Sequence, residues 1–460
     1  MKLRKRRFPS AMAILLAVIV LAALLTYLVP GGEFGSHTDP ETGETVTTLE
    51  DFRFVASQPV NLLEIPVRIV QAFLNGSTAT IVLTYLFMGG GVYILTDSGA
   101  FQAVMGWAVR KLKGNRLAMV AGFTTLFALV NLVLSPHSFV AFVPFSILFA
   151  RAIGYDAMVG VAMALLGGAV SFSTGALLAT TVAAQTMVGL PIYSGAPYRL
   201  LCMVVLLIPT ILYIYRYGER VRTGGRASLV AELEREEHAG AAELPSEVHF
   251  HHILTMLLFV GTIGLCVYGS AFHGWTNVEL SAAFLVLGIV VGLLHRHPLD
   301  EVLQMYLTGA RNMMGSAVLA GLAGAATAIL NSGGIMYTIV YYAARVITVA
   351  PPVLYAPVMF TMHLIINCFI VSGGGQAAAT MPIMGPIARL CSLPMQSAVL
   401  CFNLGDGLGN YVLPYSNQLI SYIEAGRISY GQWMRFLGKL FVIWVALAWV
   451  LTALSVFVWG

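Results

Sequence analysis

The chain has 460 residues, of which 58% are hydrophobic and only 10% charged, and its mean hydropathy is +0.82. These values exclude an ordinary soluble domain and indicate a polytopic membrane protein, so we expect the lipid bilayer around it. The net charge of +4 does not indicate nucleic-acid binding, because the basic residues form short clusters between apolar runs. The five cysteines lie in or beside apolar runs, and their placement predicts neither a disulfide nor a cysteine metal cluster.

The first apolar run, residues 11–29, is too long for a signal peptide and has no small-residue cleavage site. It predicts an uncleaved first helix. Basic residues precede this run, and residues 33–53 after it contain six acidic residues and a single arginine. By the positive-inside rule, we expect a cytoplasmic N-terminus and place the acidic segment outside the cell.

The rest of the first half is predicted to be helical. Apolar runs predict a short helix at the outer surface at 59–75 and spans at 78–96, 157–175 and 198–215. Residues 117–150 are too long for one span and too short for two spans with a loop. Because Ser135, Pro136, His137 and Ser138 interrupt this stretch, we expect a helical hairpin or a broken helix there.

A charged segment, residues 216–250, predicts a cytoplasmic helical linker between an N-terminal half, 1–215, and a C-terminal half, 251–460. Three histidines at its end have no further ligand nearby, so we expect no metal site. Apolar runs in the second half predict spans at 253–271 and 278–294, an interfacial segment at 299–313, further helices at 314–330, 335–349 and 352–371, and a last span at 436–458.

Residues 367–417 are apolar enough to lie in a membrane, but Ser372, three glycines and Gln376 interrupt them. Irregular backbone at membrane depth is tolerated where protein or a water-filled cavity surrounds it, so this stretch predicts the lining of a site. The helix expected to restart after Gln376 would point its free N–H groups at an anionic group such as a carboxylate. The hydroxyls of Ser372 and Thr380 would add directional bonds. The alternative is a glycine-rich packing seam.

Asp406 is an ionisable residue at membrane depth, which favours a functional role. It could bind Na⁺, carry a proton or hold a substrate ammonium group; the alternative is pairing with Arg389 or capping a helix. The oxygens of Asn410, Ser416 and Asn417 would complete a cluster suited to a hard cation. These four are the predicted ion-coupling residues, and Na⁺ or H⁺ is the only cofactor we consider.

The break in the first half contains no carboxylate. His137 could titrate near neutral pH and couple transport to protons, although a hydrogen-bonded histidine without that role fits equally well. The predicted substrate-binding residues from both breaks are Asn131, Ser135, His137, Ser138, Asn367, Ser372, Gly373, Gly374, Gly375, Gln376 and Thr380.

The two halves resemble each other weakly. LTDSGA at 95–100 aligns with LNSGGI at 330–335, and residues 70–190 correspond to 305–426. The loop charges place the start of the first copy outside and that of the second in the cytoplasm, which predicts inverted repeats, an arrangement that many secondary transporters use. Chance similarity between hydrophobic helices is the alternative.

SGGGQAAATMPIMGPIARL followed by FNLGDGLGN, with ARAIGYDAMVG and GLPIYSG in the first half, resembles the YfcC family, which is related to anaerobic C4-dicarboxylate carriers of the DcuC type. The resemblance implies a bacterial inner-membrane carrier for C4-dicarboxylates or amino acids, including arginine exchanged for ornithine. This chain departs from the family pattern in two places. His137 and Ser138 stand where relatives usually carry glutamates, and Leu177 and Leu178 stand where an Asn-Pro pair is usual.

We therefore predict an all-α, multi-pass secondary transporter with two broken or re-entrant helical elements around a small carboxylate-bearing solute. Alternating access would occur by an elevator-like slide of residues 117–190 and 367–426 against the other helices, which would also form a homodimer contact. No phosphate-binding GxxxxGK[ST] loop occurs, so we expect no ATP hydrolysis. The alternatives are a membrane-embedded enzyme using Asp406 and His137 and a passive channel.

Overall fold

The computed structural model describes residues 11–35, 37–38, 45–46, 49–56, 58–74, 76–111, 115–237 and 249–460. The basic residues before the first helix and several acidic residues between 36 and 48 lie outside this part of the chain. Within it, seven helical stretches are long and apolar enough to cross a membrane, and four shorter apolar helices accompany them. The predicted helical membrane architecture is confirmed at this level.

The first half begins with α1, which matches the expected first helix. Its helices are α1 (Ala11–Leu28), α2 (Ile65–Leu74), α3 (Gly76–Asp97), α4 (Ala100–Lys111), α5 (Arg116–Val130), η3 (Pro136–Phe142), α6 (Val143–Ala152), α7 (Ala157–Thr174), α8 (Ala179–Met187) and α9 (Ala196–Arg222).

The second half repeats this order of elements. After α10 (Ala231–Glu237) and α11 (Phe250–His273) come α12 (Asn277–Leu294), α13 (Leu299–Asn312), α14 (Met314–Ser332), α15 (Met336–Thr348), α16 (Tyr355–Asn367), α17 (Gly373–Leu390), α18 (Met395–Gly409), α19 (Asn417–Ala425) and α20 (Tyr430–Trp459). Several lengths correspond, for example nine residues in both α8 and α19, and 27 and 30 in α9 and α20, whereas η3 and α6 stand where the second half has the single helix α17.

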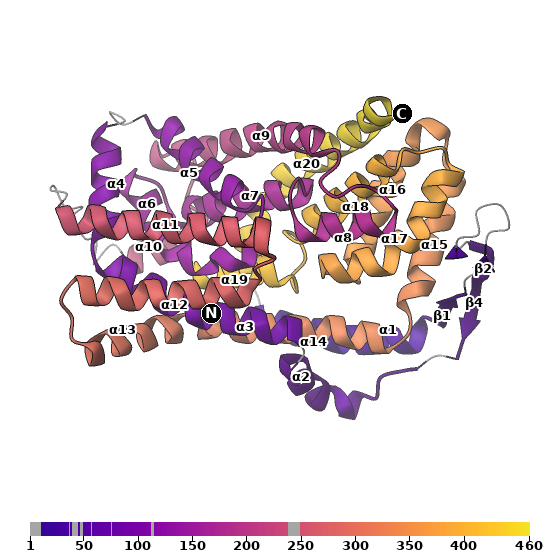
Figure 1. Cartoon of the computed structure of the whole chain (residues 1–460), viewed down its shortest axis with the longest axis horizontal. Coiled ribbons are helices and arrows are strands. Elements are labelled where there is room, and N and C mark those ends of the chain that lie inside the picture. Colours follow the sequence, from indigo (N-terminus) through magenta and orange to yellow (C-terminus); the bar gives the residue numbers. More distant parts are fainter. Residues whose placement is uncertain are drawn as a thin grey trace, which may run out of the picture.

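The helices form two groups. Helices α1, α2 and α3 pack with α12, α13 and α14, and these six helices lie along the lower part of Figure 1. We call them, together with α11, which packs on α12, the lower group. The upper group contains η3, α5 to α9 and α16 to α20; at the boundary between the groups, η3 also packs on α3 and α19 on α14. Helices α4 and α15 run across the long axis at opposite ends and connect the groups.

Packing in the lower group crosses between the halves. Helices α1 and α2 of the first half pack on α14 of the second, and α12 and α13 of the second half pack on α3 of the first. Small residues allow close approach here: a Cβ on Gly91 of α3 would lie 2.3 Å from the backbone oxygen of Phe284 in α12. Each half therefore completes its packing only with helices of the other half.

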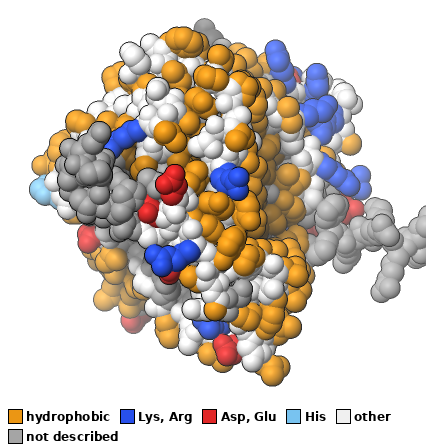
Figure 2. Space-filling view, turned by 90° about the vertical axis from the view of Figure 1, so that its right-hand side faces the viewer, with side chains coloured by type: hydrophobic (Ala, Val, Ile, Leu, Met, Phe, Trp, Pro, Cys, Tyr) orange, Lys and Arg blue, Asp and Glu red, His pale blue; other side chains and the backbone are white. Residues whose placement is uncertain are grey.

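Two small antiparallel sheets, which the sequence analysis did not predict, lie in the segment after α1. Strands β1 (Gly31–Phe34) and β4 (Phe52–Val55) pair with Gly31 opposite Val55, and β2 (His37–Thr38) pairs with β3 (Thr45–Val46). Phe52 stacks on Tyr341 of α15 at 4.0 Å between ring centroids. The end of the molecule that carries these strands shows much hydrophobic surface with small groups of charged side chains (Figure 2).

Residues of the expected linker are partly built into the upper group. Helix α9 continues to Arg222, and α10 follows it. Glu234 of α10 forms a bidentate ion pair with Arg151 of α6, at 3.0 and 3.1 Å, and accepts a bond from the backbone N–H of Ala157 at the start of α7. Residues 238–248 lie outside the described part of the chain.

Candidate functional site

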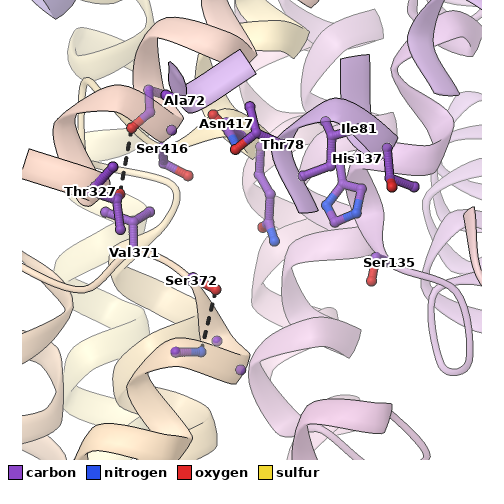
Figure 3. Close-up of a pocket in the computed structure, with 18 of the residues that line it drawn as sticks. Ala72, Thr78, Ile81, Ser135, His137, Thr327, Val371, Ser372, Ser416 and Asn417 are labelled. Carbon is purple, nitrogen blue, oxygen red and sulfur yellow. Dashed lines mark hydrogen bonds between the residues drawn. The ribbon is translucent and has the colours of Figure 1, made fainter. Parts of the chain in front are cut away.

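A cavity of about 830 Å³ lies between the two helix groups. The lower group contributes residues from α2, α3, α12 and α14, and the upper group contributes the ends of its broken helices. Figure 3 shows His137 and Ser135 on the right of this space, Val371, Ser372 and Ser416 on the left, and Asn417 toward the top. A volume of this order suits a small solute.

Four interruptions of the upper group open onto this cavity. Backbone without regular helix occurs at 131–135, 175–178, 368–372 and 410–416. Each interruption is followed by the N-terminus of a helix, and those N-termini bring Ser135, Thr180, Ser372 and Ser416 to the cavity lining. Three of the four, those of η3, α8 and α19, have no side-chain cap. Their free N–H groups and positive dipole ends therefore converge on one space.

The N-terminus of α17 begins earlier than expected. The sequence predicted a restart after Gln376, but the helix starts at Gly373, with Ser372 as its N-cap. The Ser372 hydroxyl accepts a bond from the N–H of Gly375 at 3.3 Å, and the Ser372 carbonyl accepts one from that of Gln376 at 2.7 Å. The glycines therefore form the first helical turn instead of the break itself.

Asp406 lies in the last turn of α18 directly behind this N-terminus. Its Oδ1 accepts a bond of 3.1 Å from the Asn367 amide, and its Oδ2 lies 2.7 Å from the position that a Cβ on Gly373 would occupy. Asn410, one turn further along, lies beside the same carboxyl group and lines the cavity. Asp406 is therefore enclosed between α16, α17 and α18 at the edge of the cavity.

Gln376 and Thr380 face the protein interior. The Gln376 amide donates to the backbone oxygen of His363 at 2.9 Å and accepts from Asn367 at 3.2 Å. Thr380 donates to the Gln376 carbonyl. Neither residue, nor Asn367, is among the cavity-lining residues. They hold α16, α17 and Asp406 together behind the site, a contribution that the sequence did not distinguish from direct substrate binding.

Several buried oxygens near the second-half breaks have no hydrogen-bond partner among the described residues. They belong to Asn367 Oδ1, Asn410 Oδ1, Ser416 Oγ, Asn417 Oδ1 and Gln418 Oε1. The last three of these residues, at the start of α19, line the cavity together with Asn410. Because unpartnered buried polar groups are costly, such a cluster fits a place where water, an ion or a solute supplies the missing partner.

Of the predicted residues in the first-half break, two line the cavity and two are buried in the protein. Ser135 and His137 line the cavity. The Ser138 hydroxyl is buried and donates to Oδ1 of Asn277 in α12 at 2.8 Å, and the Asn277 amide lies 3.2 Å from His137 Nε2. Asn131 is buried at the end of α5, where it donates to the Phe127 carbonyl and contacts Gly168 of α7. Ser138 and Asn131 are thus not on the cavity surface.

The sequence analysis did not single out Asn277, Thr180 or Arg68, all of which line the cavity. Asn277 follows Thr276, which forms a capping box with Glu279. The T-x-x-E pattern in the sequence indicates that a helix starts here, but it does not indicate that this helix start faces the cavity. Thr180 belongs to α8, which the sequence analysis did not predict. Arg68 lies on the amphipathic helix α2.

The charge of the lining is one-sided. Arg68, which lies 3.2 Å from Glu64, is the only Lys, Arg, Asp or Glu among the described lining residues. The remaining polar groups are hydroxyls, amides, His137 and helix N-termini. Helix N-termini favour an anionic group, so the cavity is chemically suited to a carboxylate.

A family comparison agrees with the resemblance noted from the sequence. The family model described as "DcuC: C4-dicarboxylate anaerobic carrier" matches residues 8–457. The chain belongs to the DcuC family. Its members are membrane carriers, and the predicted relationship is confirmed.

This DcuC-family protein is also similar to a protein of Escherichia coli (strain K12) named "Putative basic amino acid antiporter YfcC". The two are 24% identical, and the alignment covers 96% of this chain and 95% of the relative. The similarity therefore extends over nearly the whole length of both chains.

Two solved structures are similar over nearly the whole chain. The YdaH transporter of Alcanivorax borkumensis is 16% identical with a TM-score of 0.47, covering 97% of this chain and 98% of that one. Neisseria gonorrhoeae MtrF, described with a class of antimetabolite efflux pumps, is 17% identical with a TM-score of 0.48, covering 99% and 96%.

Proposed function

We propose that this protein is a secondary transporter that carries a small carboxylate-bearing solute through the cavity between its two helix groups. The observation that supports this most directly is the convergence of four helix N-termini on a cavity whose described lining contains no acidic residue. A carboxylate bound there would accept hydrogen bonds from the free N–H groups at these helix starts.

Asp406 is the proposed coupling residue. It lies behind the N-terminus of α17, so an ionised Asp406 would compete electrostatically with a solute carboxylate for the same helix dipole. Binding Na⁺ or H⁺ would neutralise Asp406 and remove this competition. The unpartnered oxygens of Asn410, Ser416 and Asn417 nearby would supply further ligands to a hard cation.

We further propose that the two halves are inverted repeats. Support comes from the similar order and several matching lengths of α3 to α9 and α14 to α20 and from the reciprocal packing of α1 and α2 on α14 and of α12 and α13 on α3. The loop charges give the first copy an outer start and the second a cytoplasmic start. Repeats of this kind place a solute site where their broken helices meet.

The proposed movement is a slide of the upper group against the lower group in the inner membrane. Helices α9 and α20, which the sequence placed with the stationary helices, pack on α5, α7, α16 and α18, so we assign them to the moving body. The cavity reaches α2 and the N-termini of α3 and α12, which are outer ends if the N-terminus is cytoplasmic. The structure would then represent an outward-open state. The homodimer stays a prediction.

Ligand-dependent thermal stabilisation of the purified protein tests this proposal, because a ligand that binds only the folded state raises its stability. The panel contains C4-dicarboxylates, neutral and basic amino acids, and amine analogues without a carboxylate, each with Na⁺ and with a large organic cation. We expect stabilisation by one carboxylate class and none by the amines. Stabilisation by amines alone, or by no carboxylate in either salt, would contradict the site.

The same panel separates the two substrate classes. The family description names C4-dicarboxylates, whereas the Escherichia coli relative is named for basic amino acids. A dicarboxylate would use several helix N-termini, while an amino acid would place its ammonium group toward Asp406. Counterflow of the stabilising solute in proteoliposomes, with the solute recovered unchanged, then distinguishes a carrier from an enzyme or an open channel.

A further inference from the structure

Asn277 is the residue of the lower group that reaches into the first-half break. Its side chain bonds two residues of η3 at once, accepting from the Ser138 hydroxyl at 2.8 Å and lying 3.2 Å from His137 Nε2. Asn277 and His137 both line the cavity, whereas Ser138 is buried at this contact. One amide therefore fixes both residues at the helix start that faces the solute.

The backbone of Asn277 is held firmly in the lower group. Thr276 and Glu279 close a capping box around it, with the Thr276 N–H donating to Glu279 Oε2 at 2.7 Å. The Asn277 carbonyl accepts from the Ser281 hydroxyl at 2.6 Å, and Ser281 in turn contacts Thr84 of α3 at 3.3 Å. The amide is thus presented from a rigid position, which a positioning residue requires.

We propose that Asn277 is a positioning residue that orients His137 and the η3 N-terminus for the carboxylate solute, and that it does so only while the cavity is open to the outside. The proposal rests on the proposed function, in which η3 moves and α12 does not. When the upper group slides, His137 and Ser138 leave the Asn277 amide. The site then loses the Asn277 amide that held His137 and Ser138 in place, so the affinity for the same solute differs between the two sides of the membrane.

The test is solute transport by Asn277→Ala, measured separately from the outer and the cytoplasmic face in right-side-out and inside-out vesicles. The solute is whichever carboxylate stabilises the purified wild-type protein. Removing two neutral hydrogen bonds is expected to raise the outside KM about tenfold and to leave the cytoplasmic KM unchanged. Equal changes of KM on both faces, or no change on either, would overturn the proposal.

Two further variants separate positioning from folding. Asn277→Gln keeps a neutral amide oxygen that can accept from Ser138, adds no charge to the lining and should restore part of the outside KM. Asn61→Ala serves as the matched control, because Asn61 only accepts a bond from the Leu63 N–H at a helix start away from the cavity. The KM of this variant should equal that of wild type on both faces.

The outcomes also separate this inference from the proposed function. If wild-type vesicles transport no carboxylate, the proposed function itself is wrong and the inference falls with it. If wild type transports but Asn277→Ala lacks the one-sided rise in KM, only the role of Asn277 is wrong.

Discussion

The contacts of Asp406 allow the effect of its charge to be tested separately from the effect of its shape. Asn367 donates to one carboxylate oxygen, and the other faces Gly373. An asparagine of the same shape keeps an oxygen for Asn367 but can neither bind a cation strongly nor carry a proton. The two proposed roles of this residue, coupling and local packing, therefore respond differently to the same substitution.

Asp406→Asn should abolish ion-dependent uptake while the protein remains folded. Uptake in proteoliposomes with and without an ion gradient measures the first effect, and the elution profile of the purified protein measures the second. Asp97→Asn is the control, because Asp97 ends α3 opposite the cavity-lining residue Gly76, about 30 Å away along the helix axis. Uptake that keeps its ion dependence in Asp406→Asn would remove this residue from the coupling mechanism.

Gly373→Ala and Gly374→Ala form a matched pair of substitutions in the first turn of α17. A Cβ on Gly373 would lie 2.7 Å from Asp406 Oδ2, whereas a Cβ on Gly374 would meet no atom within 4 Å. We expect Gly373→Ala to displace Asp406 and lower transport at least tenfold, at a cost of about 1–3 kcal/mol in stability. Gly374→Ala should stay within about 1 kcal/mol of wild-type stability.

Transport assays and thermal melts of both variants check this pair. Equal loss of transport in the two would show that the N-terminus of α17 rejects any side chain, and that the Asp406 contact is not the reason for glycine at 373.

At the residue scale, the sequence located the helix breaks better than it assigned the hydrogen bonds around them. Polar residues in apolar runs predicted where the helices break, because unpaired backbone at membrane depth needs a polar environment. The pattern could not say which polar side chains face the cavity. Gln376 turns inward to His363 and Asn367, while Ser372 faces the cavity, and only the helix rotation that follows from a start at Gly373 separates them.

At the scale of elements, long apolar runs were sufficient to predict α1, α3, α7, α11, α12 and α20, since a span needs about 20 apolar residues. Helix α8 was not predicted because its nine residues give too short a hydrophobic signal. Strands β1 and β4 were missed for a different reason. They are stabilised by packing on α15, through Phe52 on Tyr341, which a local pattern cannot reveal.

The anchoring of α10 gives a prediction for an element. Glu234 is mostly buried, pairs with Arg151 and accepts from the N–H of Ala157, whereas Glu236 is largely exposed in its pair with Arg427 at 3.6 Å. Glu234→Ala should remove the ion pair with Arg151 and the bond to the Ala157 N–H and cost about 2 kcal/mol, less than for a fully buried pair because both side chains retain some solvent contact.

Glu236→Ala is the control, and its cost should remain within about 0.5 kcal/mol. Thermal unfolding of the purified variants measures the difference. Equal stabilities would mean that α10 is not held by the Glu234 contacts.

At the scale of the whole molecule, the proposed slide requires the two helix groups to separate at their polar contacts. Ser316 of α14 donates to the carbonyl of Ser421 in α19 at 3.0 Å, and Ser421 donates back at 3.4 Å. In a background without the native cysteines, the double variant Ser316→Cys/Ser421→Cys should form a disulfide that stops transport. Reduction of the disulfide should restore transport. Transport that continues with the bond formed would contradict the movement.

A second cross-link within one group is the matched control. Ser397 of α18 and Ser455 of α20 share a hydrogen bond of 2.8 Å inside the upper group. The double variant Ser397→Cys/Ser455→Cys should cross-link equally well and leave transport close to wild type, because both helices are assigned to the same moving body. Arrest by this bond would place α20 with the stationary helices.

The crossed packing of the lower group has a consequence for biosynthesis. The apolar faces of α1 and α2 pack on α14, which begins at Met314, about 290 residues after Leu28. At roughly 5–20 residues per second, these helices wait on the order of 15 to 60 seconds in the bilayer before their partner emerges from the ribosome. An N-terminal half made alone would keep those faces open to chaperones and membrane proteases, and separately synthesised halves would survive only by assembling with each other.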